Sequence, residues 1–449
     1  MTTLNKIMIF LSIVLYLVIA FLLGALFAHS KYYNDFTYFM ESAAGYIYDE
    51  LTDSNPTVWI DNEELAHDGF LLVSRNYQDR LSAILIDPEG KVVKDWFFGN
   101  EVVNKDIYNH FDKDYIELDS KFFAASDTHL LPNGDVVALI ELNHLRNLRG
   151  MRILRMDKDS NIVWENIGYY HHEIDIDDGK IYALSYRLED SFPKFNDTDD
   201  YYFMHDEIEI IDLESGETLE KYSLPDGFVG TKFEDYLNSA RLYMGFQHFD
   251  LEYGKGFDVL HSNSVEYIDQ NEAAGWGIAE EGDLLISMRG PSLLALFRPD
   301  EGKIIWAERN IWRNQHYARM AGEGVIRVYD NEGAGKIQDG EFVNIPRIVD
   351  YNITKDAAEV LFFEPELYKI FSSYWRGHYV ELGDNNWLVN FPESGRIMQV
   401  VNGELVWEFR LTDRRDVIFP SYKNKTYNFR YYSRQYIENA GFLDKDSVD

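Results

Sequence analysis

Leu293–Trp306 reads LLALFRPDEGKIIW: an apolar segment, an acidic turn with a glycine, and a second apolar segment ending in tryptophan. Two short apolar segments around such a turn are typical of a β-hairpin. The unit recurs along the chain, at Ala83–Trp96, Arg152–Trp164, Glu207–Leu219 and Ile397–Trp407, with a degenerate copy at Arg347–Phe362. The fold is therefore expected to repeat one pair of strands many times.

A partner unit of similar form precedes each hairpin. The partner units are Gly69–Arg75, His129–Glu141, His172–Tyr186, His261–Arg289, His316–Tyr329 and His378–Phe391. Two units give four strands, and radial repetition of four-stranded sheets is a β-propeller. Long amphipathic helical windows are scarce, so a parallel α/β fold is disfavoured; short helical insertions are expected at Tyr236–Tyr243 and Pro365–Trp375. The sequence predicts an all-β fold, a six-bladed β-propeller over residues 61–440.

The first 60 residues follow a different pattern. Ile7–Ala28 reads IMIFLSIVLYLVIAFLLGALFA, without charge or proline, and is long enough to cross a bilayer as a helix. A cleaved signal peptide is disfavoured because a small residue is missing two positions before Ala28. The sequence therefore predicts an N-terminal transmembrane helix (residues 1–28, with a short cytoplasmic N-terminus) and a juxtamembrane stalk (residues 29–60). The bulk of the chain would lie on the periplasmic or extracellular side.

Composition excludes several classes of function. The net charge is −35, so nucleic acid is not an expected partner, because phosphate binding needs clustered Lys and Arg. There is no cysteine, which excludes disulfides, thiolate nucleophiles and zinc–thiolate sites. An anionic substrate would need a local cationic pocket within this acidic molecule.

Five partner units share a histidine just ahead of their first strand: His129, His172, His261, His316 and His378. The innermost strand of each blade lines the central channel, so these side chains are expected to converge at one mouth of it, together with Arg289 and Asn263. A lone histidine at a strand head is usually a structural hydrogen-bonding group. Five at one register favour a functional site. The other histidines (His67, His110, His144, His205 and His248) are expected at the surface or in the core.

Two kinds of chemistry fit a ring of imidazoles. Neutral imidazoles could bind a metal, but no carboxylate is expected at that register and no His-x-His or His-x-x-x-His spacing occurs. The alternative is anion handling, in which Arg, Asn and protonated His donate to sulfate or phosphate oxygens and a neutral His acts as nucleophile or base.

Several ordered segments resemble the bacterial arylsulfotransferases, which move a sulfuryl group from an aryl sulfate to a phenol without a nucleotide donor. The most specific are Asp258–Ser264 (DVLHSNS), Leu284–Gly290 (LLISMRG) and Gln315-His316 followed by Val328–Asn331 (VYDN). Weaker matches are Gly69–Trp96, His171–Ile174 (HHEI) and Gly395–Trp407. The resemblance covers residues 69–436.

The resemblance implies a role for each matching residue. His316 would take the sulfuryl group as a transient sulfohistidine, and Arg289, His172, His261 and Asn263 would hold the sulfuryl oxygens. His171, His129 and His378 are further candidates for substrate binding. It implies an aryl sulfate donor, a phenolic acceptor, no cofactor and no metal. The chain departs from the family in having Glu173 for Asp, no cysteine and no extra N-terminal β-domain.

Three hypotheses of function remain at this point. The first is the arylsulfate sulfotransferase with His316 as nucleophile. The second is a non-enzymatic, membrane-tethered propeller that acts as a binding or assembly module. The third is an aryl sulfate hydrolase, with water as acceptor.

Some other features have structural interpretations. The acidic turns 175–179 and 196–200 lack the spacing of an EF-hand loop. The hairpin tryptophans (Trp96, Trp164, Trp306 and Trp407) are expected to pack between blades rather than to mark a quinone enzyme. Aromatic residues near the histidines, namely Tyr170, Tyr317, Tyr379 and Trp276, are expected in the core, with stacking on an aryl group as the alternative.

Overall fold

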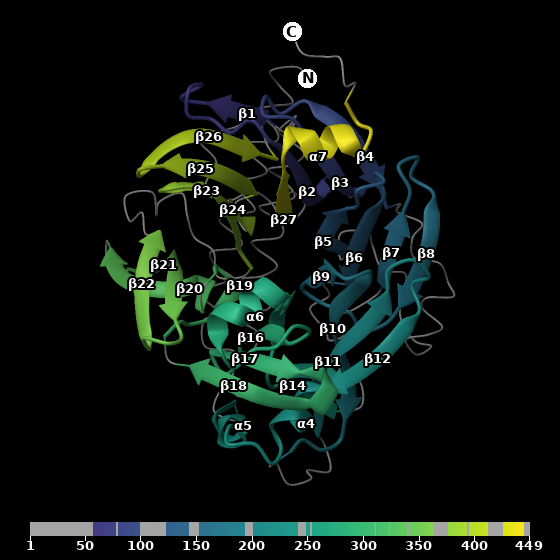
Figure 1. Ribbon diagram of the computed structural model, residues 1–449, viewed down its shortest axis with the longest axis vertical. Helices are drawn as coiled ribbons and strands as arrows, with labels where there is room; N and C mark the ends of the chain where they lie inside the picture. The colour runs from purple at the N-terminus through teal and green to yellow at the C-terminus, as the bar shows by residue number, and fades with distance from the viewer. Residues whose placement is uncertain are drawn as a thin grey trace, which may run out of the picture.

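Six β-sheets surround one central axis in the computed structural model (Figure 1). The structure describes residues 57–77, 80–98, 123–142, 152–193, 201–240, 248–251, 254–309, 311–322, 324–338, 341–362, 376–392, 395–411 and 425–443. Each sheet has a core of four strands, and the sheets follow one another around the ring. The predicted all-β, six-bladed β-propeller is confirmed.

Each blade runs from an innermost strand at the channel outward to the rim. In that direction, the first blade consists of β27 (Lys425–Tyr432), β2 (Phe70–Tyr77), β3 (Arg80–Ile86) and β4 (Val92–Phe97), and the second of β5 (Phe123–Leu130), β6 (Val136–Leu142), β7 (Arg152–Met156) and β8 (Ile162–Ile167). The third blade consists of β9 (Ile174–Asp177), β10 (Lys180–Glu189), β11 (Tyr201–Asp212) and β12 (Thr218–Ser223). Two further strands, β14 (Gly254–Asp258) and β13 (His248–Leu251), extend the sheet of the third blade from β11.

The other three blades follow in chain order. The fourth blade consists of β15 (Ser262–Tyr267), β16 (Leu284–Met288), β17 (Leu293–Arg298) and β18 (Lys303–Arg309). The fifth consists of β19 (His316–Met320), β20 (Val325–Gln338), β21 (Glu341–Asn352) and β22 (Ala357–Phe362). The sixth consists of β23 (His378–Gly383), β24 (Asn386–Phe391), β25 (Arg396–Val401) and β26 (Glu404–Arg410), with β1 (Thr57–Ile60) as its outermost strand. The degenerate hairpin predicted at Arg347–Phe362 is the pair β21–β22.

The first blade is closed by the last strand of the chain, which the repeat pattern did not identify. β27 pairs antiparallel with β2, so that Phe70 lies opposite Tyr432 and Val73 opposite Phe429. Segments from both ends of the described chain thus share one sheet, and the ring closes without an open edge there.

The boundary before the propeller also differs from the prediction. β1 falls inside the predicted stalk, but it pairs with β26 as the fifth strand of the last blade. The rest of the stalk and the predicted transmembrane helix lie outside the described residues. Among the residues that are described, no helix is long and apolar enough to span a membrane.

The core lies between neighbouring blades. Strands such as β16 are buried along their whole length, because both faces of a middle strand are covered by the adjacent blades. Full burial of one Leu or Ile side chain stabilises the fold by about 1.5–3 kcal/mol. Two of the hairpin tryptophans, Trp96 and Trp407, are completely buried, as predicted for blade packing. The Trp407 indole N–H also donates to Pro88 O at 2.7 Å, which ties the last blade to the first.

The helices in the described part of the chain are short and lie outside the blades' sheets. They are α4 (Leu224–Phe228), α5 (Asp235–Ala240), α6 (Gln270–Trp276), α7 (Arg434–Asn439) and the 3₁₀ turn η2 (Pro299–Glu301). α5 overlaps the first predicted helical insertion, whereas the second, at residues 365–375, lies outside the described residues. α6 begins with a capping box in which Asp269 and Glu272 satisfy each other's backbone N–H groups.

Candidate active site

The site is built from the heads of the innermost strands. His172 lies two residues before β9, His261 one residue before β15, and His316 is the first residue of β19. His172 (φ 62°) and His261 (φ 51°) are in the left-handed region, which non-glycine residues rarely adopt. Such strained positions are retained where the surrounding structure requires a side chain to point in an unusual direction.

His316 is held through its Nδ1 atom. Nδ1 lies 2.7 Å from Asn331 Oδ1 and 3.0 Å from Asn314 O, both of which are acceptors. The Asn331 amide is oriented in turn, because its Nδ2 donates to Arg376 O at 2.7 Å. Nδ1 therefore carries the proton, and Nε2 keeps its lone pair.

The environment keeps His316 neutral. Burial is the largest cause, and the nearby positive charge of Arg289 adds to it, so the pKa of His316 lies well below its usual value even though the Asn331 hydrogen bond raises it. The side chain is buried (4% exposed). A neutral imidazole with an unprotonated Nε2 is the form required of a nucleophile.

His172 and His171 form a hydrogen-bonded pair. Nδ1 of one lies 2.8 Å from Nδ1 of the other, and Nε2 of His171 reaches Ser185 O at 3.3 Å. Because a carbonyl only accepts, Nε2 of neutral His171 carries its proton and Nδ1 accepts from Nδ1–H of His172. His171 thus orients His172 and leaves the Nε2 atom of His172 for other partners.

His261 is paired with a carboxylate. Its Nδ1 lies 2.6 Å from Asp258 Oδ2, and both side chains are buried. A carboxylate beside an imidazole favours the doubly protonated ring, which can donate from Nε2. The rings of His172 and His261 are 5.0 Å apart, and those of His172 and His316 are 6.4 Å apart. In all three rings Nδ1 forms the hydrogen bond to a protein group, and the three rings lie close together.

Arg289 and Asn263 belong to the same centre. The backbone N–H of Arg289 donates to His261 O at 3.0 Å, and its charge acts on His316. Asn263 donates to Gln315 O at 2.7 Å. Gly290 permits this close approach, since a Cβ there would lie 2.4 Å from Val259 O.

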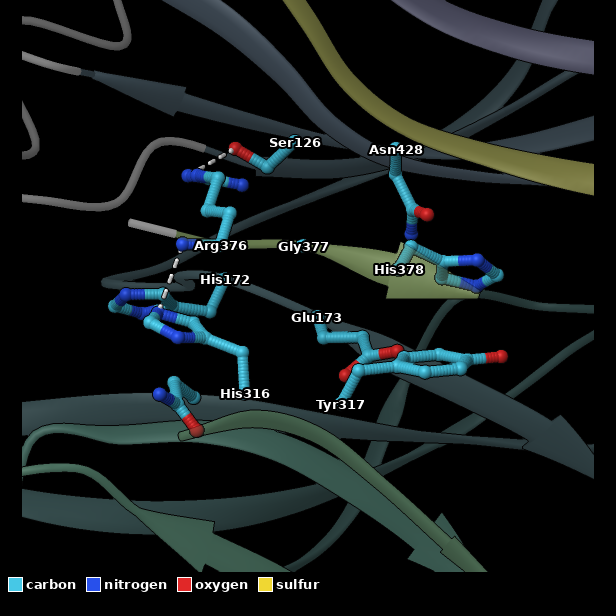
Figure 2. Close-up of a pocket in the computed structure, with 10 residues that line it drawn as sticks. Ser126, His172, Glu173, His316, Tyr317, Arg376, Gly377, His378 and Asn428 are labelled. Carbon is cyan, nitrogen blue, oxygen red and sulfur yellow. Dashed lines mark hydrogen bonds between the residues drawn. The ribbon is translucent and has the colours of Figure 1, made fainter. Parts of the chain in front are cut away.

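A cavity of about 310 Å³, including the part open to solvent, lies at this centre. Its lining residues are Ser126, His172, Glu173, Asn263, His316, Tyr317, Arg376, Gly377, His378 and Asn428. Figure 2 shows His172, His316 and Arg376 together at one end, and Glu173, Tyr317, His378 and Asn428 at the other. We call these the histidine end and the aromatic end.

The aromatic end is neutral in character. The ring of His378 lies 3.7 Å from that of Tyr317 and 4.8 Å from that of Phe429, measured between centroids. His378 is buried, neither of its ring nitrogens has a hydrogen-bond partner among the described residues, and burial holds its pKa well below the usual value. Burial also raises the pKa of Glu173 to about 8, although the Arg319 guanidinium that pairs with it acts in the opposite direction.

Not every predicted site residue reaches the cavity. His129 lies near the far end of β5, where it bonds Ile174 O at 3.1 Å and sits 3.4 Å from Asp127. The prediction that all five histidines lie at the head of a strand was wrong for His129. Six residues of β5 precede it, so it lies near the end of the strand rather than at its head. The sequence-based expectation of no carboxylate at the register was also wrong, since Glu173 lines the cavity.

The remaining histidines divide as follows. His67 is buried against Trp407, with rings 4.5 Å apart, and His205 is buried and bonds Ser191 O. The side chains of His110, His144 and His248 lie outside the described residues. Within the part of the chain that the structure describes, no cluster of His, Asp and Glu could hold a metal ion.

Sequence reasoning missed four residues of the cavity: Ser126, Arg376, Gly377 and Asn428. Asn428 is on β27, whose place in the first blade could not be read from the repeat. Arg376 left a signal that could have been used. It precedes a strand-head histidine by two residues, as His172 precedes β9 by two.

The fold and the cavity define a class of protein: a β-propeller whose channel mouth carries a neutral histidine beside cationic and amide donors. The arylsulfotransferase family model matches residues 128–412, more than half of the chain, and the protein belongs to that family. The resemblance noted in the sequence is thereby confirmed, and membership indicates aryl sulfotransfer. Among curated proteins, none matches the chain significantly.

Solved structures similar to this chain include several propellers. A protein of unknown function from Bacteroides caccae covers 79% of this chain and 98% of its own, with 9% identity and a TM-score of 0.42. The β-propeller domain of Cps50 (Swd1) from Myceliophteria thermophila covers 79% and 86%, with 11% identity and a TM-score of 0.39. The WD40 propeller domain of Doa1 covers 85% and 93%, with 10% identity and a TM-score of 0.39.

Proposed function

We propose that the protein transfers a sulfuryl group from an aryl sulfate to a phenolic acceptor through a sulfohistidine at His316. The observation that carries the proposal is the orientation of His316. Its Nδ1–H is held by Asn331 and Asn314, and burial and Arg289 keep it neutral. Family membership supplies the substrate class.

In the first half-reaction, Nε2 of His316 attacks the sulfur of the donor. An N–S bond forms as the bond between sulfur and the aryl oxygen breaks, and the phenolate leaves with the electron pair. Arg289, His261 and Asn263, together with His172 when its ring is doubly protonated, are the donors proposed to hold the three sulfuryl oxygens. Preorganised donors in a buried site stabilise charge in the transition state more than water does.

In the second half-reaction, the acceptor phenol gives up its proton and its oxygen attacks the sulfur. The N–S bond breaks and His316 returns to its neutral form. His172 is suited to take the phenol proton, because the pair with His171 leaves its Nε2 unprotonated when the ring is neutral. A covalent intermediate predicts ping-pong kinetics.

The aromatic end of the cavity is proposed to receive the aryl ring. Tyr317 and His378 offer ring faces, and the unpartnered nitrogens of His378 offer hydrogen bonds to a polar substituent. His378 is therefore retained as a substrate-binding residue. His129 and His171 are placed behind the site and act through Asp127 and His172, respectively.

Membrane anchoring remains part of the proposal. The apolar stretch at residues 7–28 would tether the propeller to a bilayer, with the catalytic domain on the periplasmic or extracellular side. Detection of the chain in the membrane fraction, and its release when residues 1–28 are deleted, would support this; a chain that fractionates identically with and without them would contradict it.

Phenolate release from phenyl sulfate by the full chain, with and without a second phenol, tests the proposed reaction. Release over many turnovers that requires both the second phenol and His316 supports the transferase. Equal activity of the His316→Ala variant would contradict the nucleophile. Release that continues beyond a single turnover without an acceptor would support the hydrolase, and absence of release under both conditions would favour a binding propeller.

A further inference from the structure

Arg376 occupies the same place in the last blade that His172 occupies in the third. Each lies two residues before an innermost strand, β23 and β9 respectively, and each is in the left-handed region, with φ of 59° and 62°. The position therefore directs its side chain to the channel mouth in both blades. In the last blade the residue is a cation.

The main chain of Arg376 covers the proposed nucleophile. Its backbone N–H donates to Nε2 of His316 at 3.1 Å, so the lone pair that must attack sulfur is occupied. Figure 2 shows this bond as a dashed line between the two residues. Attack by Nε2 requires that this hydrogen bond be broken first.

The guanidinium of Arg376 is bound across the channel mouth to the second blade. It pairs with Glu141 on β6, and it lies 3.2 Å from Ser126 Oγ on β5. Glu141 is 1% exposed and also accepts from the Ser126 hydroxyl. Oε2 of Glu141 accepts from Nη2 of Arg376, and a sulfate ester offers the same planar fork several oxygens.

We propose that Arg376 is a further substrate-binding residue: its guanidinium exchanges Glu141 for the oxygens of the incoming sulfate ester, and the accompanying shift of its N–H uncovers Nε2 of His316. The ester's identity rests on the proposed function. Glu141 then acts as a competitor that holds the cation in the empty site. Its negative charge also disfavours entry of anions that cannot displace it.

The exchange predicts opposite effects for its two partners. Arg376→Ala removes the cation and should weaken binding of inorganic sulfate by about tenfold or more. Arg376→Lys keeps the positive charge but not the planar guanidinium, so its affinity for sulfate should lie between those of the wild type and Arg376→Ala. Glu141→Gln removes the competitor and should strengthen binding by about threefold or more. If the ion pair were purely structural, substitution of either partner would weaken sulfate binding.

The matched control is Arg298→Ala. Arg298 is exposed to a similar degree (14% against 15% for the Arg376 side chain) and is ion-paired with Asp283, but it lies at the end of β17 and does not line the cavity. The Arg298→Ala variant therefore reports the cost of removing a partly buried, ion-paired arginine that lies away from the cavity. Melting temperatures of all four variants identify a fold that is lost.

Titration calorimetry of the full chain with inorganic sulfate is the deciding measurement. Weaker binding by Arg376→Ala together with tighter binding by Glu141→Gln supports the exchange. Unchanged affinity in Arg376→Ala, or affinity that fails to rise in Glu141→Gln, overturns it. Phenolate release is measured separately. If the variants bind sulfate in this pattern but the wild-type chain releases no phenolate, the proposed reaction is contradicted while the exchange is still supported.

Discussion

Individual residues in the cavity act through the protonation state that their neighbours impose. His316, His172 and His261 are the same residue type, but they are held by an amide, an imidazole and a carboxylate, respectively. Three chemically different acceptors give three different tendencies to hold a second proton. The proposed division into nucleophile, base and donor follows from these neighbouring groups rather than from the histidines themselves.

Removal of the Asn331 amide should impair the nucleophile. Asn331→Ala leaves Nδ1 of His316 with the weaker Asn314 contact, so the ring can turn and its tautomer is no longer fixed. We expect kcat to fall by about tenfold or more with little change in KM for the donor. Steady-state kinetics measure both. Asn166→Ala, which removes an amide that bonds Gly216 O on outer strands, is the control; equal kcat in both variants would contradict this role.

The rate of the first half-reaction should be insensitive to mild acid. The pKa of His316 is lowered by burial and by Arg289, so the ring stays neutral as the pH falls from about 7.5 to about 5.5, a range in which an exposed imidazole protonates. The burst of phenolate in stopped-flow experiments measures this step. A burst rate that halves near pH 6.5 would show that His316 has an ordinary pKa.

At the scale of elements, the site depends on how each innermost strand begins. Left-handed residues at His172, His261 and Arg376 turn the chain just ahead of their strands, and Gly377 continues this turn at φ 125°. A Cβ at Gly377 would lie 2.2 Å from the Tyr329 ring. The head of β23 can therefore approach β20 only because this residue is glycine.

Gly377→Ala should destabilise the fold more than an ordinary glycine substitution. Gly322 is the control, because alanine there also takes a positive φ (86°), while a Cβ there meets nothing within 4 Å. We expect Gly377→Ala to lose about 1–3 kcal/mol more than Gly322→Ala, because the methyl group clashes with a buried ring. Urea denaturation measures the difference, and equal losses would mean that the Tyr329 ring simply moves aside.

The closing strand β27 is fixed by an ion pair. Arg430 lies 2.9 Å from Asp127 of β5, and Asn428 donates to the same carboxylate at 2.7 Å. Burial opposes ionisation of Asp127, but Arg430 and His129 outweigh it and hold the pKa of Asp127 below its usual value. The carboxylate is therefore charged in the folded protein at neutral pH.

Arg430→Met should be costly at neutral pH and less so in acid. Removing the cation leaves a buried charge uncompensated, which costs about 3–5 kcal/mol. A depressed folded-state pKa contributes stability above the unfolded value of about 3.9, and this contribution is lost as the pH falls through the folded-state value. The difference between the two proteins in urea should thus shrink below pH 4. A constant difference from pH 7 to pH 3 would exclude this origin.

For the whole molecule, an acidic surface surrounds a site that must accept an anion. The net charge is −35, whereas Arg289, Arg376 and Arg319 gather at the channel. Long-range repulsion is screened by salt, whereas contacts inside a buried site are screened much less. The acidic exterior should therefore slow the approach of the donor without affecting its conversion.

Added sodium chloride should accordingly raise kcat/KM for phenyl sulfate and leave kcat nearly constant. Between about 0.01 and 0.1 M salt the Debye length falls from about 30 to about 10 Å, which removes most of the repulsion. Initial rates at subsaturating and saturating donor separate the two effects. A kcat/KM that falls with salt would mean that attraction by the site's cations outweighs the exterior.

The sequence predicted those features of the structure that depend on residues close together in the chain. Turn residues and the tryptophan at the end of four of the hairpins act over a few residues, so the blades and the strand-head histidines could be predicted. β27 pairs with β2 across more than 350 positions of the chain, and no local pattern marks it. The contact between Arg376 and Glu141 spans 235 residues and likewise depends on the closed ring.

The pairing of β27 with β2 also sets an order of events during synthesis. The ribosome releases β27 after every other strand of the propeller, and Asn428 on this strand lines the cavity. Until then the innermost place of the first blade is unfilled and the pocket lacks one wall. Folding and assembly of the active site are thus completed by the same late step, so a chain whose translation stops early remains both open and inactive.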